Sequence, residues 1–217
     1  MTVSSGKSGP GSSSTKSPPR TSKADARRRE LIAAASRVLL RGGAGTASVR
    51  AVADEAQVSV GSVLYYFDSF DELLRQTMEN VLEEFYGRRL KVIAAPGSPA
   101  HRLARMIELG VPDEISEDLG LLYGSLSFAR TNPQLQPMHR SIVERQVDLY
   151  RTLIEVGAES GDFDPQSPAE AIARNLVALE DAYDLYALVG IALDGEQRRA
   201  QVRSYAELAL GCRLPAN

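Results

Sequence analysis

Three observations predict that this chain is an all-α protein. Apolar residues recur at intervals of three and four along most of the sequence, which is the period of one helix face. Serine, aspartate, proline and glycine stand where these segments begin and end, as they do in helix caps. No stretch alternates apolar and polar residues over the length that a half-buried strand requires. With 43% hydrophobic and 24% charged residues among 217, the chain is long and apolar enough for two globular parts.

The first predicted helix covers residues 23–40. The glycine-rich stretch 42–45 ends it, because glycine disfavours the helical conformation. That stretch follows a helix pattern rather than a strand, so we expect it to be a connector. The apolar stripe of the helix consists of Leu31, Ala34, Ala35, Val38 and Leu39.

Two short helices joined by a tight turn are predicted between residues 48 and 66. Apolar residues at i, i+3, i+4 and i+7 from Val49 define one face of the first helix. Ser48 and Ser59 are placed to cap these two helices, and Ser69 is placed to cap the helix that follows. Two helices with a turn of this length form a helix-turn-helix, whose second helix enters the major groove of DNA.

This stretch resembles the N-terminal domain of TetR-family transcriptional regulators. The resemblance covers about residues 28–85. Many positions match at fixed spacing, which makes the likeness far more specific than one short motif would be. The matching residues are Ser48, Val49, Arg50, Val52, Ala53, Ala56, Val58, Ser59, Gly61, Tyr65, Phe67, Ser69, Glu72, Leu73 and Leu74.

Four positions depart from the family pattern. Gln57 stands where the family has the turn glycine, so a backbone position that favours positive φ carries a side chain, at a cost of ~1 kcal/mol. Leu64 replaces a tyrosine and Tyr66 a histidine. Phe70 replaces a lysine that contacts a DNA phosphate in relatives. These changes leave the predicted fold intact and alter the expected contacts with DNA.

The resemblance implies that the second helix and its surroundings bind double-stranded DNA. Ser62 and Tyr65 suit hydrogen bonds to phosphate, whereas the start of the helix suits close backbone approach and contact with thymine methyl groups. One of the two tyrosines, Tyr65 or Tyr66, is expected to pack the small core instead. The candidate DNA-binding residues are Arg50, Ser59, Val60, Gly61, Ser62, Leu64, Tyr65 and Tyr66.

The rest of the chain predicts a succession of longer helices. Ser167 opens one of them with a capping box that has proline in the first helical position, and Asp194 opens another with a similar box. The predicted ranges are 69–93, 99–110, 114–130, 133–160, 168–192 and 194–211.

The resemblance also implies how these helices are organised. We expect a disordered basic arm rich in serine, glycine and proline over residues 1–22, a helix-turn-helix DNA-binding domain over 23–70, and a helical ligand-binding and dimerisation domain over 71–217. The last two helices of each subunit would form a four-helix bundle in a homodimer. The implied function is that of a repressor that binds a palindromic operator and is released by a small molecule.

A pocket for that small molecule is expected between the central helices, since clefts in helix bundles commonly bind ligands. Glu180, Asp181 and Asp184 form either a solvated or dimer-rim face, or part of the pocket. No lysine follows Lys91, and the arginines of the neighbouring helices read as exposed, so an internal cation is scarce. We therefore expect an apolar inducer with a positive charge, such as a lipophilic amine or polyamine. The candidate ligand-binding residues are Met106, Leu122, Tyr123, Leu126, Phe128, Met138, Tyr150, Glu180, Asp181, Tyr183 and Asp184.

Charge is distributed unevenly along the chain, whose net charge is −3. Residues 1–70 carry ten Lys and Arg against five Asp and Glu, whereas residues 71–217 carry fifteen against twenty-three. A basic first part and an acidic remainder suit a protein that meets a polyanion at one end. The basic residues from Lys16 to Arg29 either contact DNA as an arm or merely keep a tail soluble.

Several other classes are disfavoured. His101 and His139 are isolated and have no metal-ligand spacing around them, and no nucleophile is accompanied by a base, so we expect no catalytic residues, no metal and no cofactor. No apolar run approaches the ~18 residues of a membrane helix, and the N-terminal stretch has no hydrophobic segment of the signal-peptide type. The single Cys212 agrees with a reducing compartment, so a cytoplasmic protein without a membrane partner is expected.

One alternative keeps the same fold. The chain could be an architectural or adaptor DNA-binding protein that senses no small molecule. A filled core without a cavity, and an affinity for DNA that small molecules leave unchanged, would favour that alternative over a ligand-responsive regulator.

Overall fold

The computed structural model describes residue 1 and residues 23–42, 47–131, 136–191 and 193–215, with the side chains of 42, 118 and 127–131 outside that description. All regular structure in these ranges is helical, so the predicted all-α class is confirmed. The described helices are α1 (Lys23–Gly42), α2 (Val49–Glu55), α3 (Val60–Tyr66), α4 (Phe70–Ala94), α5 (Pro99–Gly110), α6 (Glu117–Thr131), α7 (Gln136–Ser160), α8 (Ala169–Leu188) and α9 (Gly195–Leu210).

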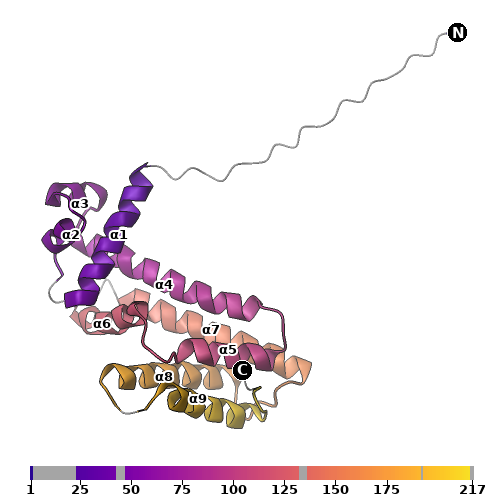
Figure 1. Ribbon diagram of the computed structural model, residues 1–217. Helices are drawn as coiled ribbons and strands as arrows, with labels where there is room; N and C mark the ends of the chain where they lie inside the picture. The colour runs from indigo at the N-terminus through magenta and orange to yellow at the C-terminus, as the bar shows by residue number, and fades with distance from the viewer. Residues whose placement is uncertain (2–22, 43–46, 132–135, 192, 216–217) are drawn as a thin grey trace.

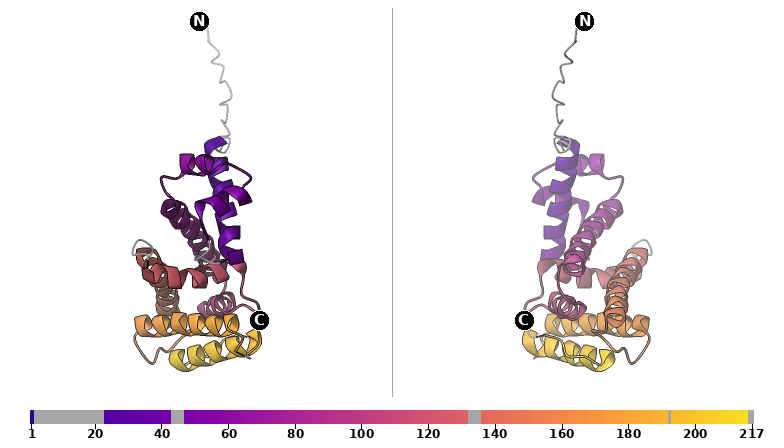
Figure 2. Two further views of the ribbon diagram at one scale, coloured as in Figure 1. Left: turned by 90° about the vertical axis from the view of Figure 1, so that its left-hand side faces the viewer. Right: turned by 90° about the vertical axis from the view of Figure 1, so that its right-hand side faces the viewer.

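The first and the last helices of the chain lie at opposite ends of the molecule. Helices α1, α2 and α3 lie at one end, and α8 and α9 lie at the opposite end (Figure 1). The two side views show the same succession, with the yellow α9 farthest from α1 (Figure 2). Helix α4 contacts both α1 and α7, while α7 packs along α8. One long helix, α4, therefore connects the two ends.

Helices α1 to α3 bury a small hydrophobic core between them. Leu31, Val52, Val63 and Phe67 are almost fully buried there, and Leu73 at the start of α4 completes the cluster. The whole predicted stripe of α1 is buried. Burying these side chains is the main source of stability for α2 and α3, which have seven residues each and are too short to persist alone.

A larger core lies between α5, α7, α8 and α9. Leu103, Ile154, Leu176 and Val202 represent these four helices in it, and each is almost fully buried. In the part of the chain that the structure describes, no helix combines the length and the apolar character needed to cross a bilayer.

Serine caps set where several helices begin. The side-chain oxygens of Ser48, Ser59, Ser69 and Ser98 each accept a hydrogen bond from the backbone N–H three residues later, over 3.1–3.3 Å. The capping box at Asp194 is also present. These predictions are confirmed because capping depends only on residues adjacent in the chain.

The predicted capping box at Ser167 is wrong. Helix α8 starts at Ala169, with Pro168 as the N-cap and no side-chain hydrogen bond, so Ser167 lies one residue too early to cap it. The helix also ends at Leu188 rather than 192, since the chain turns at Gly190 with a φ of 74°.

One further helix start differs from the prediction, and two predictions fall on residues that the structure does not describe. The predicted start at 114 is wrong, because Ser116 accepts a hydrogen bond from the backbone N–H of Leu119 and α6 begins at Glu117. The predicted start at 133 and the arm over residues 2–22 lie outside the described residues.

The turn between α2 and α3 generates a prediction about stability. Gln57 has a φ of 54°, as the sequence predicts for the position of the family's glycine. Gln57→Gly should raise the free energy of unfolding by about 0.5 kcal/mol, since about 1 kcal/mol of strain is relieved and the greater freedom of the unfolded chain offsets part of it. Urea denaturation measures this change. Ala56→Gly is the matched control, because Ala56 has a φ of −83°; it should lower stability, and equal effects of both variants would contradict the prediction.

Candidate nucleic-acid interface and buried polar network

The orientation of α3 is fixed at both of its ends. At its start, the Ser59 hydroxyl accepts a hydrogen bond from the backbone N–H of Ser62 and donates one to the Ser62 hydroxyl, both over 3.1 Å. At its end, Phe67 is buried in the core of α1 to α3, and Val63 anchors the middle of the helix in the same core. The opposite face of α3 is therefore held towards solvent.

The side chains on that outward face do not pack in the core of α1 to α3. Gly61, Leu64 and Tyr65 lie at i, i+3 and i+4 and are exposed, and Tyr65 is 81% exposed. Tyr66 is half-buried against the core, with its ring edge-on to that of Tyr65 at 5.1 Å. Of the two tyrosines, Tyr66 packs and Tyr65 projects from the surface.

The remaining candidates surround this face. Arg50 is exposed on α2, while Val60 and Ser62 are half-buried. A Cβ added at Gly61 would approach only the Ser59 hydroxyl, at 3.8 Å, so the protein's own packing does not require glycine there. The start of α3 is thus an open surface that another molecule can approach closely.

Arg28 and Phe70 support the helix-turn-helix from behind. Arg28 donates hydrogen bonds to the Tyr66 carbonyl oxygen at 2.9 Å and to Gln76 at 3.0 Å, and its guanidinium lies 4.7 Å from the centre of the Phe67 ring. Phe70 packs against the core of α1 to α3. Arg28 therefore joins α1 to α3 and α4, which differs from its expected place among arm residues that contact phosphate.

A second concentration of functional side chains lies in the interior between α4, α7 and α8. The Arg89 guanidinium pairs with the Glu180 carboxylate at 2.8 Å, and the Tyr150 hydroxyl donates a hydrogen bond to the other oxygen of Glu180. Arg89 is 1% exposed and Glu180 is 2% exposed. Gly110 on α5 makes room for this carboxylate, since an added Cβ would overlap it.

The neighbouring carboxylates on α8 continue this arrangement. The Tyr123 hydroxyl lies 3.0 Å from Asp181 and 3.2 Å from Asp184. Arg198 lies 3.5 Å from Asp184 and donates hydrogen bonds to the carbonyl oxygens of the α5–α6 connection. Together these side chains form the buried polar network: Arg89, Tyr123, Tyr150, Glu180, Asp181, Asp184 and Arg198.

Burial controls the protonation of this network. Burial by itself would lower the pKa of Arg89, but the charge of Glu180 raises it, so the guanidinium stays charged. Burial raises the pKa of Tyr150 and of Tyr123, which keeps both hydroxyls protonated as donors. Burial, together with the charge of Glu180, raises the pKa of Asp184 to about 7. With two arginines and three carboxylates, the network has more acidic than basic groups.

Arg89 and Arg198 contradict the expectation that an internal cation is scarce, and the burial of Glu180 and Asp184 contradicts a solvated face for these two carboxylates. The sequence indicated that both arginines are buried. Arg89 follows Phe85 at i+4 on the apolar stripe of α4, and Arg198 precedes Val202 at the same spacing on the buried stripe of α9. A charged residue on a buried stripe requires a partner, so these positions pointed to buried ion pairs.

The other predicted ligand-binding residues lie in different places. Met106 is fully buried in the larger core, Leu122 is buried beside α4, and Tyr183 is half-buried against the larger core. Leu126 is exposed, and the side chain of Phe128 lies outside the described residues.

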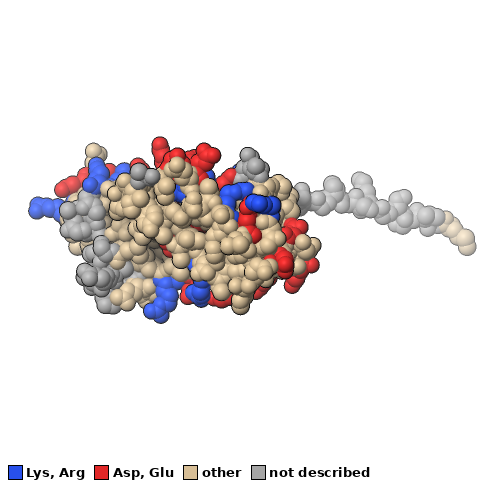
Figure 3. All heavy atoms as spheres, turned by 90° about the horizontal axis from the view of Figure 1, so that it is seen from below, with Lys and Arg blue, Asp and Glu red and all other residues tan. Residues whose placement is uncertain are grey.

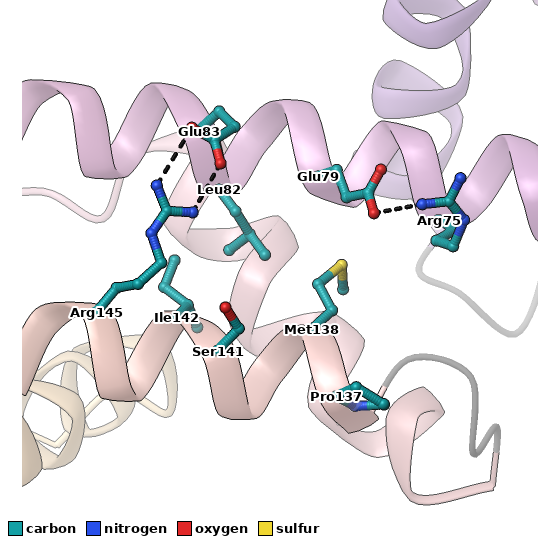
Figure 4. Close-up of a pocket in the computed structure, with 9 residues that line it drawn as sticks. All are labelled: Arg75, Glu79, Leu82, Glu83, Pro137, Met138, Ser141, Ile142 and Arg145. Carbon is teal, nitrogen blue, oxygen red and sulfur yellow. Dashed lines mark hydrogen bonds and ion pairs between the residues drawn. The ribbon is translucent and has the colours of Figure 1, made fainter.

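Met138 lines a groove of about 540 Å³ between α4 and α7. Figure 4 shows Leu82 and Ile142 between the two helices, with the Glu83–Arg145 ion pair crossing at one end. This groove brings together one predicted residue and several that sequence reasoning did not select.

Metal binding finds no support among the described residues, where no group of three or more His, Cys, Asp or Glu is placed to hold an ion. His139 is half-buried beside the Ser125 hydroxyl at 3.0 Å, and burial lowers its pKa. Neither histidine belongs to the network.

Comparisons with known proteins identify relatives. A family model described as "Bacterial regulatory proteins, tetR family" matches residues 31–77, which run from α1 into α4. The HTH-type transcriptional regulator BetI of Burkholderia ambifaria is 28% identical over 196 residues, which are 88% of this chain and 98% of BetI. The uncharacterized HTH-type transcriptional regulator YfiR of Bacillus subtilis is 26% identical, over 85% and 89% of the two chains. The nicotine-responsive transcriptional repressor HdnoR of Paenarthrobacter nicotinovorans is also 26% identical, over 73% and 82%.

Solved structures share the whole arrangement of helices. A transcriptional regulator from Saccharomonospora viridis in complex with choline superposes with a TM-score of 0.77, at 20% identity over 85% of this chain and 97% of its own. A TetR transcription regulator from Haloarcula marismortui gives the same TM-score at 24% identity, over 85% and 98%. These two likenesses show a shared fold.

The raised pKa of Asp184 generates a prediction about pH. An unfolded aspartate has a pKa of about 3.9, so the folded state binds this proton more tightly and stability falls as pH rises from about 4 towards 7. Asp184→Asn removes that contribution, so its stability relative to wild type should improve by about 1–3 kcal/mol between pH 5 and pH 8. Urea denaturation across this range measures the difference, with Asp54→Asn on the exposed surface as the control. A constant difference would contradict the assignment. Glu180 and Asp181, whose pKa values burial also raises, leave a residual slope of the same sign.

Proposed function

Because this chain belongs to the TetR family of transcriptional regulators, we propose that it is a ligand-responsive repressor that binds a palindromic operator as a homodimer. A small molecule releases it from DNA by favouring a different spacing of the two heads. The heads are residues 23–70, and residues 71–217 sense the ligand and dimerise. Successive major grooves on one face of DNA are about 34–36 Å apart, so the dimer must hold its heads at that spacing or a multiple of it.

The observation that carries this proposal is the outward face of α3. Leu64 and Tyr65 are large, exposed side chains on a helix that is capped and anchored from behind. Folding gains little from leaving them in solvent, whereas a tyrosine hydroxyl and an apolar side chain suit phosphate and thymine methyl groups. Arg50, Ser59, Val60, Gly61, Ser62 and Tyr66 complete the proposed DNA-binding set.

The exposed faces of α8 and α9 support dimerisation. Leu185 on α8 is 40% exposed and Leu208 on α9 is 78% exposed. Viewed from below, towards α8 and α9, the molecule presents a broad area without charged residues, with Lys, Arg, Asp and Glu mostly towards its edges (Figure 3). An area without charge suits the centre of a protein interface, where charged residues are depleted. The uncharged residues of α8 on this face are Ala171, Ala178, Ala182 and Leu185, and Val189 follows directly after the helix.

The proposed inducer is an apolar molecule with a positive charge, because the buried polar network has an excess of acidic groups. Internal arginines are present, but three carboxylates still outnumber them in the buried polar network. Two relatives add support, since one structure holds choline and HdnoR responds to nicotine, and both molecules are amines or ammonium compounds. If the chain is instead an architectural or adaptor protein without a ligand, no cation should change its affinity for DNA.

Replacing Tyr65 tests the DNA-binding face. After selection of an operator from random duplexes, Tyr65→Ala should weaken binding by about 1–3 kcal/mol, because a contact made only with DNA is lost. Tyr65→Phe separates the hydroxyl from the ring, and Leu90→Ala, exposed on α4, is the matched control. Fluorescence anisotropy with labelled operator measures the affinities. Unchanged affinity of a folded Tyr65→Ala variant would remove Tyr65 from the interface.

Charging the α8–α9 face tests the dimer. Leu208→Glu would place a carboxylate in the centre of the proposed interface, where its desolvation opposes association. We expect sedimentation equilibrium to show a shift from dimer to monomer, accompanied by loss of operator binding. Leu90→Glu makes the same change at an exposed position of α4, away from α8 and α9, and should remain dimeric. A dimer that persists in Leu208→Glu with unchanged affinity would place the interface elsewhere.

A further inference from the structure

Arg89 occupies a site that has the chemistry of a receptor for organic cations. Its guanidinium lies 4.7 Å from the centre of the Phe85 ring and 5.9 Å from that of Tyr150, and it pairs with Glu180 at 2.8 Å. Aromatic faces combined with a carboxylate attract ammonium and guanidinium groups strongly where water is excluded. Here the chain's own arginine fills that site.

Several buried polar atoms at and near this site make no hydrogen bond. Arg89 Nε and Nη1 and Arg198 Nε are buried and have no hydrogen-bond partner among the described residues, while Arg198 Nη1 and Asp184 Oδ1 contact each other as an ion pair at 3.5 Å without a hydrogen bond. Unpaired buried polar atoms are rare in folded proteins, and each such group requires an explanation. Arg89 is therefore held by one ion pair and two aromatic rings rather than by a full set of hydrogen bonds, which makes it a replaceable occupant.

A groove of about 540 Å³ between α4 and α7 shares residues with the cluster next to this site. Leu82, Met138 and Ile142 form its apolar part, and the ion pairs Arg75–Glu79 and Glu83–Arg145 also line it (Figure 4). Leu82 and Ile142 belong to the same hydrophobic cluster as Phe85, whose ring supports Arg89. The groove is therefore connected to the Arg89 site through that cluster.

We propose that an organic cation with an apolar body binds Glu180 in place of the Arg89 guanidinium, with its body in the groove between α4 and α7. This inference rests on the proposed ligand-responsive function and names the ligand class, the recognition carboxylate and the internal group that the ligand displaces. A neutral or anionic molecule in the same place would leave Glu180 buried without a cation, which strongly disfavours its binding.

The displacement links the ligand to DNA through α4. Arg89 on α4 and Glu180 on α8 join two elements that are far apart in the chain, and a free cation that replaces Arg89 removes that bond. The start of α4 packs on the core beneath the helix-turn-helix through Phe70 and Leu73. The ligand therefore binds better to the arrangement in which α4 is released from α8, and this difference in affinity sets how far DNA binding shifts.

Chemical rescue tests whether the site accepts an external cation. Arg89→Ala removes the atoms that ethylguanidinium would supply, so this compound should raise the melting temperature of the variant by about 3 °C or more at about tenfold above its Kd. Uncharged ethylurea is the control probe and should have no effect. The double variant Arg89→Ala with Glu180→Gln should respond to neither compound, because the carboxylate that binds the cation is absent. An equal response of the single and the double variant to ethylguanidinium would overturn the inference.

Titration calorimetry on the wild-type protein gives a second measurement, which stands even if Arg89→Ala does not fold. Choline should bind, whereas its uncharged carbon isostere 3,3-dimethylbutan-1-ol should not. Glu180→Gln should weaken choline binding by about 10- to 100-fold, since a charged bond is lost. Glu155→Gln, exposed on α7, should bind as wild type does. The inference fails if choline does not bind, or if it binds equally to Glu180→Gln.

Operator titrations separate this inference from the proposed function. If choline binds through Glu180 and leaves the affinity for operator unchanged, the cation site is supported and ligand-responsive release is contradicted. If an uncharged or anionic compound releases the operator, ligand-responsive release is supported and the displacement of Arg89 is contradicted.

Discussion

Arg89 on α4 and Glu180 on α8 form a fully buried ion pair, and the packing of four helices depends on it. Tyr150 on α7 donates a hydrogen bond to the same carboxylate, and Gly110 on α5 has no side chain because the carboxylate fills that space. Neither charge could remain buried alone, since removing one partner of such a pair costs about 3–5 kcal/mol. The pair therefore determines how closely α4, α5, α7 and α8 approach one another.

Helix α4 connects this ion pair to the core of α1 to α3 at the other end of the molecule. Its 25 residues span roughly 37 Å at 1.5 Å per residue. Leu73 near its start is buried in the core of α1 to α3, and Val81 near its middle packs with Leu39 of α1 and Leu121 of α6. Because these contacts are close-packed, a movement of α4 at Arg89 cannot be absorbed locally and must shift α1 to α3 relative to α8.

The sequence predicts best what depends on neighbouring residues. The cap at Ser59 and the positive φ of Gln57 are determined within one turn of chain, and both agree with the structure. Ser167 shows the limit, because a shift of one residue in the helix start removes a cap that the pattern matches well. The partnership of Arg89 and Glu180 joins residues 91 positions apart, and no local pattern specifies it. Helical spacing could place Arg89 on a buried stripe, but only the packed structure could show which carboxylate it meets.

The polar composition of the buried network bears on function. Replacing buried ion pairs with hydrophobic residues of similar volume is often neutral or stabilising by about 1–4 kcal/mol, so the same four helices could also pack around an apolar set of side chains. Arg89 Nε and Nη1 and Arg198 Nε are also buried without hydrogen-bond partners among the described residues, each at a cost of about 1–3 kcal/mol. A regulator that exchanges an internal cation for a ligand needs such a site, because the ligand must be able to displace Arg89 and still be held by Glu180. The network therefore favours a sensing regulator over an architectural protein of the same fold.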